Sequence, residues 1–460
     1  MHSVGEALLT DLYQLTMAQA YFELGMKESA VFELFVRRLP ETRRFLLAAG
    51  LEPALEYIES LRFTADDIAF LATLGKFRAG FLDYLRSVRF SGSLYALPEG
   101  SPFFANEPIV RVSAPILEAQ LLESRLINIV HFQTMIASKA ARCVIAARGR
   151  QLIDFGMRRA HEADAAVFAA RAAYLTGFDA TATVEAGRRF GIPLSGTLAH
   201  SFIEAYDREE QALRSFVLSS PEPTTLLIDT YDSARALQRV IALARELTQS
   251  GSEHRIRAIR IDSGDLAAQA RMARSALDAH DCRDIRIVLS GSLDEQVIER
   301  LVTSNVPVDA FGVGTALGVS ADAPALDMAY KLQEYAGKPR RKRSPGKATW
   351  PGVKQVFRER AASGEYLCDR VARADERPGG EPLLIEVMRN GRRSVPSPAL
   401  PALREHCSNE MRALPAQLRE LSPAVAPYPV SISRRGRSDV GTRPTGVDEP
   451  QHLALGLIAW

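Results

Sequence analysis

The sequence is poor in cysteine and has no large excess of either charge. Its 460 residues include only four cysteines, and no two of them form a C-x-x-C pair. This spacing excludes a disulfide framework and a zinc ribbon. The 57 basic residues nearly balance 55 acidic ones, giving a net charge of +2, so the overall charge favours binding neither to nucleic acid nor to a membrane surface. Any anion-binding site must therefore be local.

Long hydrophobic runs are also absent. No apolar stretch is long enough to span a bilayer, and the opening MHSVGEALLTDLYQL has neither a basic leader nor an apolar core before a small-residue cleavage site. We therefore expect a cytoplasmic protein with no membrane partner. The length exceeds the size at which a single hydrophobic core stops growing, so we expect a large domain and a smaller one.

Between about residues 150 and 317, the sequence repeats a short apolar run, a polar or glycine-rich tip and a helical pattern. Gaps of 21 to 33 residues separate the tip residues Asp154, Asp179, His200, Asp229, Asp262, Gly291 and Gly314. Each gap fits one strand plus one helix, and we predict helices at 233–251 and 265–280. An open doubly wound sheet and a closed barrel both accommodate such a series. The barrel is favoured, because an open sheet concentrates its polar tips at one switch point.

The flanking regions have other patterns. A helix that begins after Thr10 or Asp11, and alternating runs at 29–40 and 88–100, indicate an α+β region. Ser292 and Glu295 are spaced as a helix capping box. The predicted divisions are an N-terminal α+β domain at 1–115, an α/β barrel with the active site at 116–337, strand-like segments at 338–421, and a Pro-, Ser- and Arg-rich mobile tail at 422–460.

Two candidate site motifs follow strands. In DFGMRRAHEADA, Arg158 and Arg159 come just after Phe155. Such an arginine pair grips a carboxylate or phosphate with a forked geometry, although a salt-bridged helix start is the alternative. In IRIDSGDL, Arg260 and Asp262 are two residues apart and share one face of a strand. That face either lines the mouth of the barrel or holds a structural ion pair.

Two further motifs involve glycine and histidine. FGVGTALG presents backbone N–H groups at Gly312, Gly314 and Thr315 in a phosphate-binding pattern, with a tight turn as the alternative. In SGTLAHSFIEAYD, His200 is a catalytic candidate because it lies at a strand tip, although a lone histidine is usually structural. The SPGKAT stretch lacks the glycine spacing of a P-loop and has Ala348 after its lysine, so ATP would need another element.

Taken together, these stretches resemble the nicotinate phosphoribosyltransferase family. TDLYQLTMAQAY, DFGMRRAH, SGTLAHSFIEAY, IRIDSGDL, FGVGTAL and GKATWPGVKQVFR occur in the family's order, from near residue 8 to about 360. The resemblance implies an α/β fold: an irregular TIM-like α/β barrel plus an α+β domain built from the N-terminal region and the later C-terminal segments. It also implies a homodimer whose active sites are completed across the interface.

The implied reaction joins nicotinate to 5-phosphoribosyl 1-diphosphate and gives nicotinate mononucleotide and diphosphate, a step of NAD salvage. ATP hydrolysis is coupled to it through a phosphohistidine, which falls on His200. A neutral imidazole suits this role because a pKa near 6.5 leaves a lone pair free at cellular pH. Mg²⁺ is the implied metal, because the leaving diphosphate develops negative charge.

The resemblance also assigns binding residues. The family's nicotinate contacts fall on Tyr13, Thr197 and Arg260, with Phe155 and Arg158 close by in the related nicotinamide enzymes. The loop that contacts the phosphate of the sugar donor falls on Thr315 and its neighbours Gly312 and Gly314, and we add Gly291. The predicted catalytic residues are His200, Arg260 and Asp262. Asp262 or Asp229 is expected to hold the metal or to face the developing cation.

Three other functions compete with this interpretation. Nicotinamide phosphoribosyltransferase has the same fold and histidine, but SGTLAHSF resembles the nicotinate branch more closely. A barrel aldolase or isomerase acting on a sugar phosphate usually needs a strand-tip lysine or paired acids, and none of the tips has a lysine. A non-catalytic paralogue that only binds nucleotide would have little reason to retain Tyr13, His200, Arg260 and Asp262 together.

Overall fold

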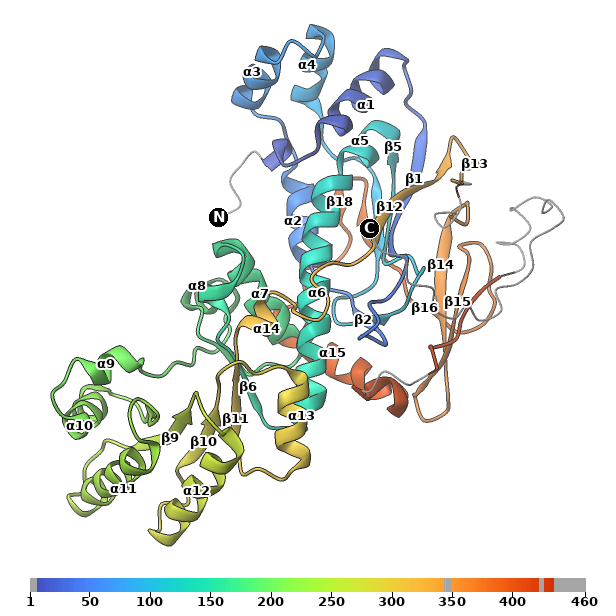
Figure 1. The fold of residues 1–460 in the computed structure, drawn as a ribbon. Helices are drawn as coiled ribbons and strands as arrows, with labels where there is room; N and C mark the ends of the chain where they lie inside the picture. Colours follow the sequence, from blue (N-terminus) through green and yellow to red (C-terminus); the bar gives the residue numbers. More distant parts are fainter. Residues whose placement is uncertain (1–5, 343, 345–348, 422–425, 434–460) are drawn as a thin grey trace, which may run out of the picture.

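The computed structural model describes residues 6–342, 344, 349–421 and 426–433. Two large sheets dominate it, and the long helix α6 (Glu123–Ala147) runs between them (Figure 1). This helix contacts elements of both sheet systems, including β12 on one side and α7 and α13 on the other. None of the helices in the described ranges combines the length and apolarity that a membrane span requires.

The first sheet has seven strands in the order β13-β12-β1-β5-β3-β17-β18. All its pairs are antiparallel, and β1, between β12 and β5, is buried along nearly its whole length. The strands are β1 (Ser29–Val36), β3 (Ser93–Ala96), β5 (Val110–Pro115), β12 (Met328–Tyr335), β13 (Lys338–Pro339), β17 (Ile385–Arg389) and β18 (Arg392–Arg393). Segments from both ends of the chain therefore share one sheet, which confirms the predicted α+β region of mixed origin.

Short helices and one small sheet accompany this region. Asp11 is the N-cap residue of α1, as predicted. The elements are η1 (Glu6–Leu8), α1 (Leu12–Glu23), α2 (Leu51–Ser60), α3 (Ala65–Thr73), α4 (Ala79–Ser87), α5 (Ile116–Leu121) and the pair β2 (Leu46–Leu47) and β4 (Pro102–Phe103). The strand β12 falls within the range 116–337 expected for the barrel, but it pairs with β1.

The second sheet is parallel and curled, with six strands in the order β7-β6-β11-β10-β9-β8. The strands are β6 (Gln151–Asp154), β7 (Ala180–Thr181), β8 (Thr224–Leu227), β9 (Ile256–Ile261), β10 (Arg286–Leu289) and β11 (Ala310–Val313). This confirms the irregular α/β barrel, but as an incomplete one. Within the described residues, no strand ladder joins β7 to β8, and only an isolated bridge between Thr181 and Leu194 extends the β7 edge.

Helices alternate with these strands. They are η2 (Met157–Arg159), α7 (Ala163–Thr176), α8 (Val184–Phe190), α9 (His200–Glu204), α10 (Glu209–Ser219), α11 (Ser233–Gln249), α12 (Leu266–Ala279), α13 (Glu295–Thr303) and α14 (Thr315–Gly318). The predicted helices at 233–251 and 265–280 are confirmed as α11 and α12. Each begins with an aspartate N-cap, Asp232 or Asp265, whose side chain accepts a backbone N–H bond.

The start of α13 corrects one prediction. The capping box between Ser292 and Glu295 is wrong, because Asp294 is the N-cap and accepts a bond from the Val297 N–H. Glu295 is instead fully buried and pairs with Lys139 of α6. The capping-box rule considers only neighbouring residues in the sequence, so it cannot identify Lys139, 156 positions away, as the partner of Glu295.

A third sheet completes the C-terminal region. Its strands are β14 (Lys354–Arg360), β15 (Tyr366–Arg373), β16 (Glu381–Pro382) and β19 (Val430–Ile432), and the helices α15 (Leu400–Ala413) and η3 (Ala416–Arg419) lie between β18 and β19 in sequence.

The expected mobile tail at 422–460 falls mostly outside the described residues, namely at 422–425 and 434–460. Within 426–433, β19 pairs with β15, and the Tyr428 ring stacks on Phe104 at 3.9 Å. Burial of the Tyr428 ring fixes this stretch against the rest of the structure.

Candidate active site

A cavity of about 540 Å³ lies at the carboxyl ends of strands in the parallel sheet. Side chains and backbone that follow β6, β10 and β11 line it, together with the end of β9. Eight predicted site residues are among its lining: Phe155, Arg158, Arg260, Asp262, Gly291, Gly312, Gly314 and Thr315. Because the carboxyl ends of parallel strands meet at one edge, residues up to 160 positions apart converge here.

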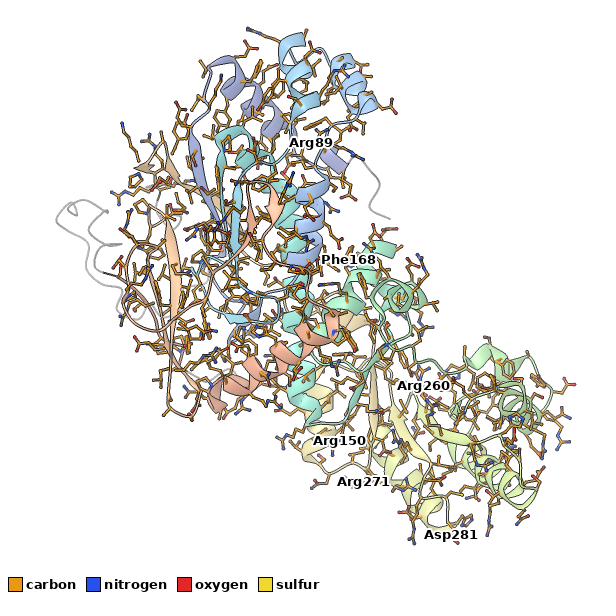
Figure 2. The ribbon with its side chains drawn as sticks, turned by 180° about the vertical axis from the view of Figure 1, so that it is seen from behind. Arg89, Arg150, Phe168, Arg260, Arg271 and Asp281 are labelled. Carbon is orange, nitrogen blue, oxygen red and sulfur yellow. The ribbon has the colours of Figure 1, made fainter. Side chains whose placement is uncertain are left out.

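Arg260, labelled in Figure 2, is held by three hydrogen bonds. Its Nε donates to Ser290 Oγ at 2.7 Å, and its Nη1 donates to Thr197 Oγ1 at 2.8 Å. Its Nη2 pairs with Asp262 Oδ1 at 2.5 Å. Arg260 and Asp262 therefore share a face at the mouth of the sheet, as the strand pattern predicts. Three contacts fix the plane of the guanidinium before any ligand arrives.

Asp262 lines the cavity and carries a carboxyl group whose pKa is lowered. Burial opposes its ionisation, but the hydrogen bond from Ser290 Oγ at 2.5 Å and the charge of Arg260 outweigh that cost and lower its pKa. The carboxylate therefore faces the cavity ionised at neutral pH.

Asp229 supplies a second carboxylate from the neighbouring tip. Its Oδ2 accepts bonds from the backbone N–H of Asp262 at 3.0 Å and from Ser263 Oγ at 2.6 Å. Its Oδ1 is buried, and no group in the described ranges donates a hydrogen bond to it. The same ranges contain no cluster of three or more His, Cys, Asp or Glu side chains arranged to bind a metal. Mg²⁺ is commonly held by only one or two carboxylates plus substrate phosphates, so this donor set fits it.

His200 is the first residue of α9, beside these groups. Its Nδ1 lies 3.1 Å from Thr230 Oγ1 on the tip that follows β8. No hydrogen bond within the described part of the chain engages Nε2. The ring is therefore oriented through one nitrogen, and the other nitrogen is left for chemistry.

Phe155 forms an aromatic wall of the cavity. Its ring lies under the Arg260 guanidinium, 5.1 Å from ring centre to Cζ. A Cβ at Gly312 would lie 2.4 Å from two carbons of this ring, and a Cβ at Gly291 would lie 1.8 Å from the Asp262 carbonyl oxygen. Gly291 also has a φ of +87°. The chain thus requires glycine at both positions for packing, whether or not their N–H groups bind a phosphate.

Three of the predicted site residues, His200, Thr197 and Tyr13, do not line the cavity, although His200 lies beside it. Thr197 reaches it through its bond to Arg260, but Tyr13 is separate. Tyr13 lies on α1, 47% exposed, and Figure 1 places α1 beside α4 and α5, away from the parallel sheet.

Two hydroxyl groups were not identified as site residues from the sequence. Ser290 bridges Arg260 and Asp262, and Thr230 contacts His200. Their positions at strand tips, in IVLSGS and LLIDTYDS, were the available signal.

Comparison with known proteins agrees with these motifs. The model of the nicotinate phosphoribosyltransferase N-terminal domain matches residues 8–131, and the model of the nicotinate phosphoribosyltransferase family matches residues 150–339. The chain is 46% identical over 430 residues to nicotinate phosphoribosyltransferase pncB2 of Mycobacterium tuberculosis H37Rv, covering 93% of this chain and 92% of that protein. It is 43% identical over 374 residues to nicotinate phosphoribosyltransferase of Bacillus subtilis, covering 78% and 76%.

The fold matches a solved structure as well. The crystal structure of human nicotinic acid phosphoribosyltransferase superposes with a TM-score of 0.83 at 29% sequence identity, covering 94% of this chain and 99% of that one. The M. tuberculosis relative and the human structure each cover more than nine tenths of the chain, and the two family models match parts of the range 8–339. This chain therefore belongs to the nicotinate phosphoribosyltransferase family.

Proposed function

We propose that the protein is a nicotinate phosphoribosyltransferase that couples synthesis to ATP hydrolysis through a phosphohistidine at His200. It joins nicotinate to 5-phosphoribosyl 1-diphosphate and releases nicotinate mononucleotide and diphosphate. The observation that carries this proposal is the cavity in which Arg260, Asp262 and Phe155 converge. The names of the relatives from M. tuberculosis and B. subtilis support the same reaction.

The base would bind against the aromatic wall. A flat pyridine ring stacks favourably on Phe155. Arg260 is already engaged with Asp262, whereas Arg158 lines the cavity and forms no ion pair with any described residue. Arg159 also lines the cavity without an ion pair, so we propose Arg158, with Arg159 beside it, for the carboxylate of nicotinate, which nicotinamide lacks. Thr197 orients the site by fixing one end of the Arg260 fork.

The sugar donor would occupy the glycine-rich side of the cavity. Its phosphates face the segments around Gly291, Gly314 and Thr315, where backbone N–H groups are available. As the bond to diphosphate breaks, positive charge develops on the anomeric carbon, and the ionised Asp262 stabilises it. Mg²⁺ held by Asp229 or Asp262 would neutralise negative charge on the leaving diphosphate.

His200 would carry the ATP step. If Nδ1–H donates to Thr230 Oγ1, Nε2 keeps a lone pair and attacks the terminal phosphorus of ATP. The phosphorus–oxygen bond to ADP then breaks. Water later cleaves the phosphorus–nitrogen bond, releases phosphate and restores His200. The free energy of this hydrolysis drives an otherwise poorly favoured synthesis.

One assay tests the reaction. Purified protein is incubated with 5-phosphoribosyl 1-diphosphate, Mg²⁺, ATP and either nicotinate or nicotinamide, and mononucleotide and ADP are measured. We expect product with nicotinate. Equal use of both bases would contradict the nicotinate assignment, and preference for nicotinamide would favour that enzyme. Absence of product with either base would favour a non-catalytic paralogue.

A substitution tests the phosphohistidine. His200→Ala is expected to abolish ADP formation and to leave at most slow, uncoupled synthesis. His280→Ala is the control, because His280 lies among the residues before β10, at the opposite ends of the strands. Unchanged ADP formation in His200→Ala would remove the proposed role.

We also propose that the enzyme is a homodimer in which Tyr13 completes the partner's site. Tyr13 is exposed and lies outside its own cavity. Chains carrying Tyr13→Ala and chains carrying His200→Ala are denatured together and refolded. Hybrid dimers then contain one intact site, so about a quarter of wild-type activity should return. Failure to regain activity above either parent would contradict a shared site.

A further inference from the structure

A buried cluster of charged side chains lies behind the cavity. Lys139 of α6 pairs with Glu295 at 2.5 Å and with Asp322 at 3.0 Å. Arg142, one turn further along α6, donates to the other Glu295 oxygen at 2.8 Å. Arg43 pairs with Asp322 at 3.0 Å. These side chains are between 0% and 9% exposed.

The two carboxylates lie immediately after the two walls of the cavity. Glu295 begins α13, three residues after Ser292, which lines the cavity from the β10 side. Asp322 follows Ala321, the last lining residue on the β11 side. The ammonium group of Lys139 therefore connects the base of loop 290–294 to the base of segment 314–322.

Further contacts hold the Asp322 side of this junction. Asp322 Oδ2 accepts bonds from Thr42 Oγ1 at 2.9 Å and Arg43 Nε at 3.1 Å, and Arg43 Nη2 donates to Ser320 Oγ at 2.5 Å. Burial opposes ionisation of both carboxyl groups, but their cationic neighbours outweigh it and lower both pKa values. Removing one partner from such a cluster leaves an uncompensated buried charge, so the junction resists deformation.

We propose that Lys139, Glu295 and Asp322 are positioning residues that set the separation of the two cavity walls to which the diphosphate of the sugar donor binds. This inference rests on the proposed function. The three groups touch no substrate, and they act through the loops that they anchor. Displacement of a wall by a fraction of an ångström would weaken every phosphate contact. The Phe155 wall would shift less, because Phe155 follows β6 directly and its N–H bonds to Val313 inside β11, before the segment 314–322 begins.

The test uses Glu295→Gln and Lys139→Met, which change the buried charge in opposite directions. Glu99→Gln is the matched control, because Glu99 is also a fully buried partner of an arginine, Arg171 at 2.6 Å, and does not line the cavity. For each protein we would measure the KM for the sugar donor, the KM for nicotinate, kcat, and the Kd of inorganic diphosphate by calorimetry. Thermal unfolding checks that each variant is folded.

Both test variants are expected to raise the KM for the sugar donor and the Kd of diphosphate by about ten-fold, with less than about three-fold change in the KM for nicotinate. Tighter diphosphate binding by Glu295→Gln together with weaker binding by Lys139→Met would show an effect of charge alone and overturn the proposal. Values equal to those of Glu99→Gln would also overturn it. Should Lys139→Met not fold, Asp322→Asn replaces it with the same expected weakening; because it changes the buried charge in the same direction as Glu295→Gln, tighter diphosphate binding by both variants would then show an effect of charge alone and overturn the proposal. Wild-type protein that neither binds diphosphate nor forms product would overturn the proposed function itself.

Discussion

The ring of Phe155 packs directly on the backbone of Gly312. The two residues lie on adjacent strand tips, and the Phe155 N–H also donates to the Val313 carbonyl at 2.8 Å. No side chain fits between them, since even a Cβ would approach two ring carbons to 2.4 Å. The glycine in FGVG therefore places the aromatic wall that we propose for the base.

Replacement of Gly312 by alanine is expected to push Phe155 out of position. Overpacking of this kind costs about 1–3 kcal/mol, and we expect the KM for nicotinate to rise by about ten-fold or more. Gly80→Ala is the control, because its Cβ would meet only one ring atom of Phe22, at 3.9 Å. Steady-state kinetics with nicotinate varied provides the measurement, and an unchanged KM in Gly312→Ala would contradict the proposed wall.

The substitution Arg260→Lys keeps the positive charge but is expected to reduce catalytic activity strongly. Lysine keeps the charge, but its single ammonium cannot satisfy Ser290, Thr197 and Asp262 in the geometry of the fork. We expect kcat/KM to fall by about a hundred-fold. Arg257→Lys, at an exposed position on the same strand, should change it less than about two-fold. Similar kinetics for the two variants would show that only charge is needed at position 260.

Thr230→Val removes a hydroxyl group while keeping the shape of the side chain. Without its contact to Thr230, the His200 ring loses its orientation, and ADP formation is expected to drop by about ten-fold at an unchanged KM for nicotinate. Thr224→Val is a matched control on β8, the strand that precedes Thr230, because Thr224 Oγ1 is buried and finds no partner among the described residues. Equal ADP formation in both variants would exclude Thr230 from the phosphoryl step.

Asp154 gives a prediction about pH. Its carboxyl group accepts bonds from the Gly156 N–H at 2.8 Å and from Thr181 Oγ1 at 2.7 Å, but burial outweighs them and raises its pKa. The folded state thus binds this proton more tightly than the unfolded state does. Its contribution to stability is full below the unfolded pKa and is lost as the pH rises through the folded pKa.

The variant Asp154→Asn cannot titrate, and its amide can retain a bond to each neighbour. The melting temperature of Asp154→Asn minus that of the wild type should therefore be higher at about pH 8 than at about pH 5. Thermal unfolding of both proteins at the two pH values measures the difference. A difference that does not change with pH would mean that Asp154 has the same pKa in both states.

Local sequence patterns predict individual helices and strands better than they predict which strands and side chains pair with one another. The apolar spacing in 233–251 identified α11 to within two residues, because helix signals lie within the helix itself. The pairing of β12 with β1 joins positions almost 300 residues apart, and nothing in either strand specifies it. Glu295 shows the same limit, since its spacing from Ser292 fits a capping box but its partner is Lys139.

The part of the candidate site that the sequence predicts is the part in which residues at the ends of strands lie close together. Arg260 and Asp262 share a face through a strand period of two, and their contact follows directly. Ser290 and Thr230 were missed because a serine or threonine at a strand tip is common, and only the three-dimensional structure shows which charged group it meets. The place of Tyr13 outside the cavity cannot be predicted from its motif either, since a motif does not say where its helix packs in the fold.

The gap between β7 and β8 has a consequence for dynamics. Residues 195–199, which carry Thr197 and lead to His200, cross this gap without regular structure, and beyond Ser195 no strand ladder holds them. Their amide hydrogens should exchange with solvent long before those of β9, β10 and β11. His200 thus follows a stretch of backbone outside any strand ladder, while the two segments that we propose to bind the diphosphate are tied to buried charged groups through Glu295 and Asp322.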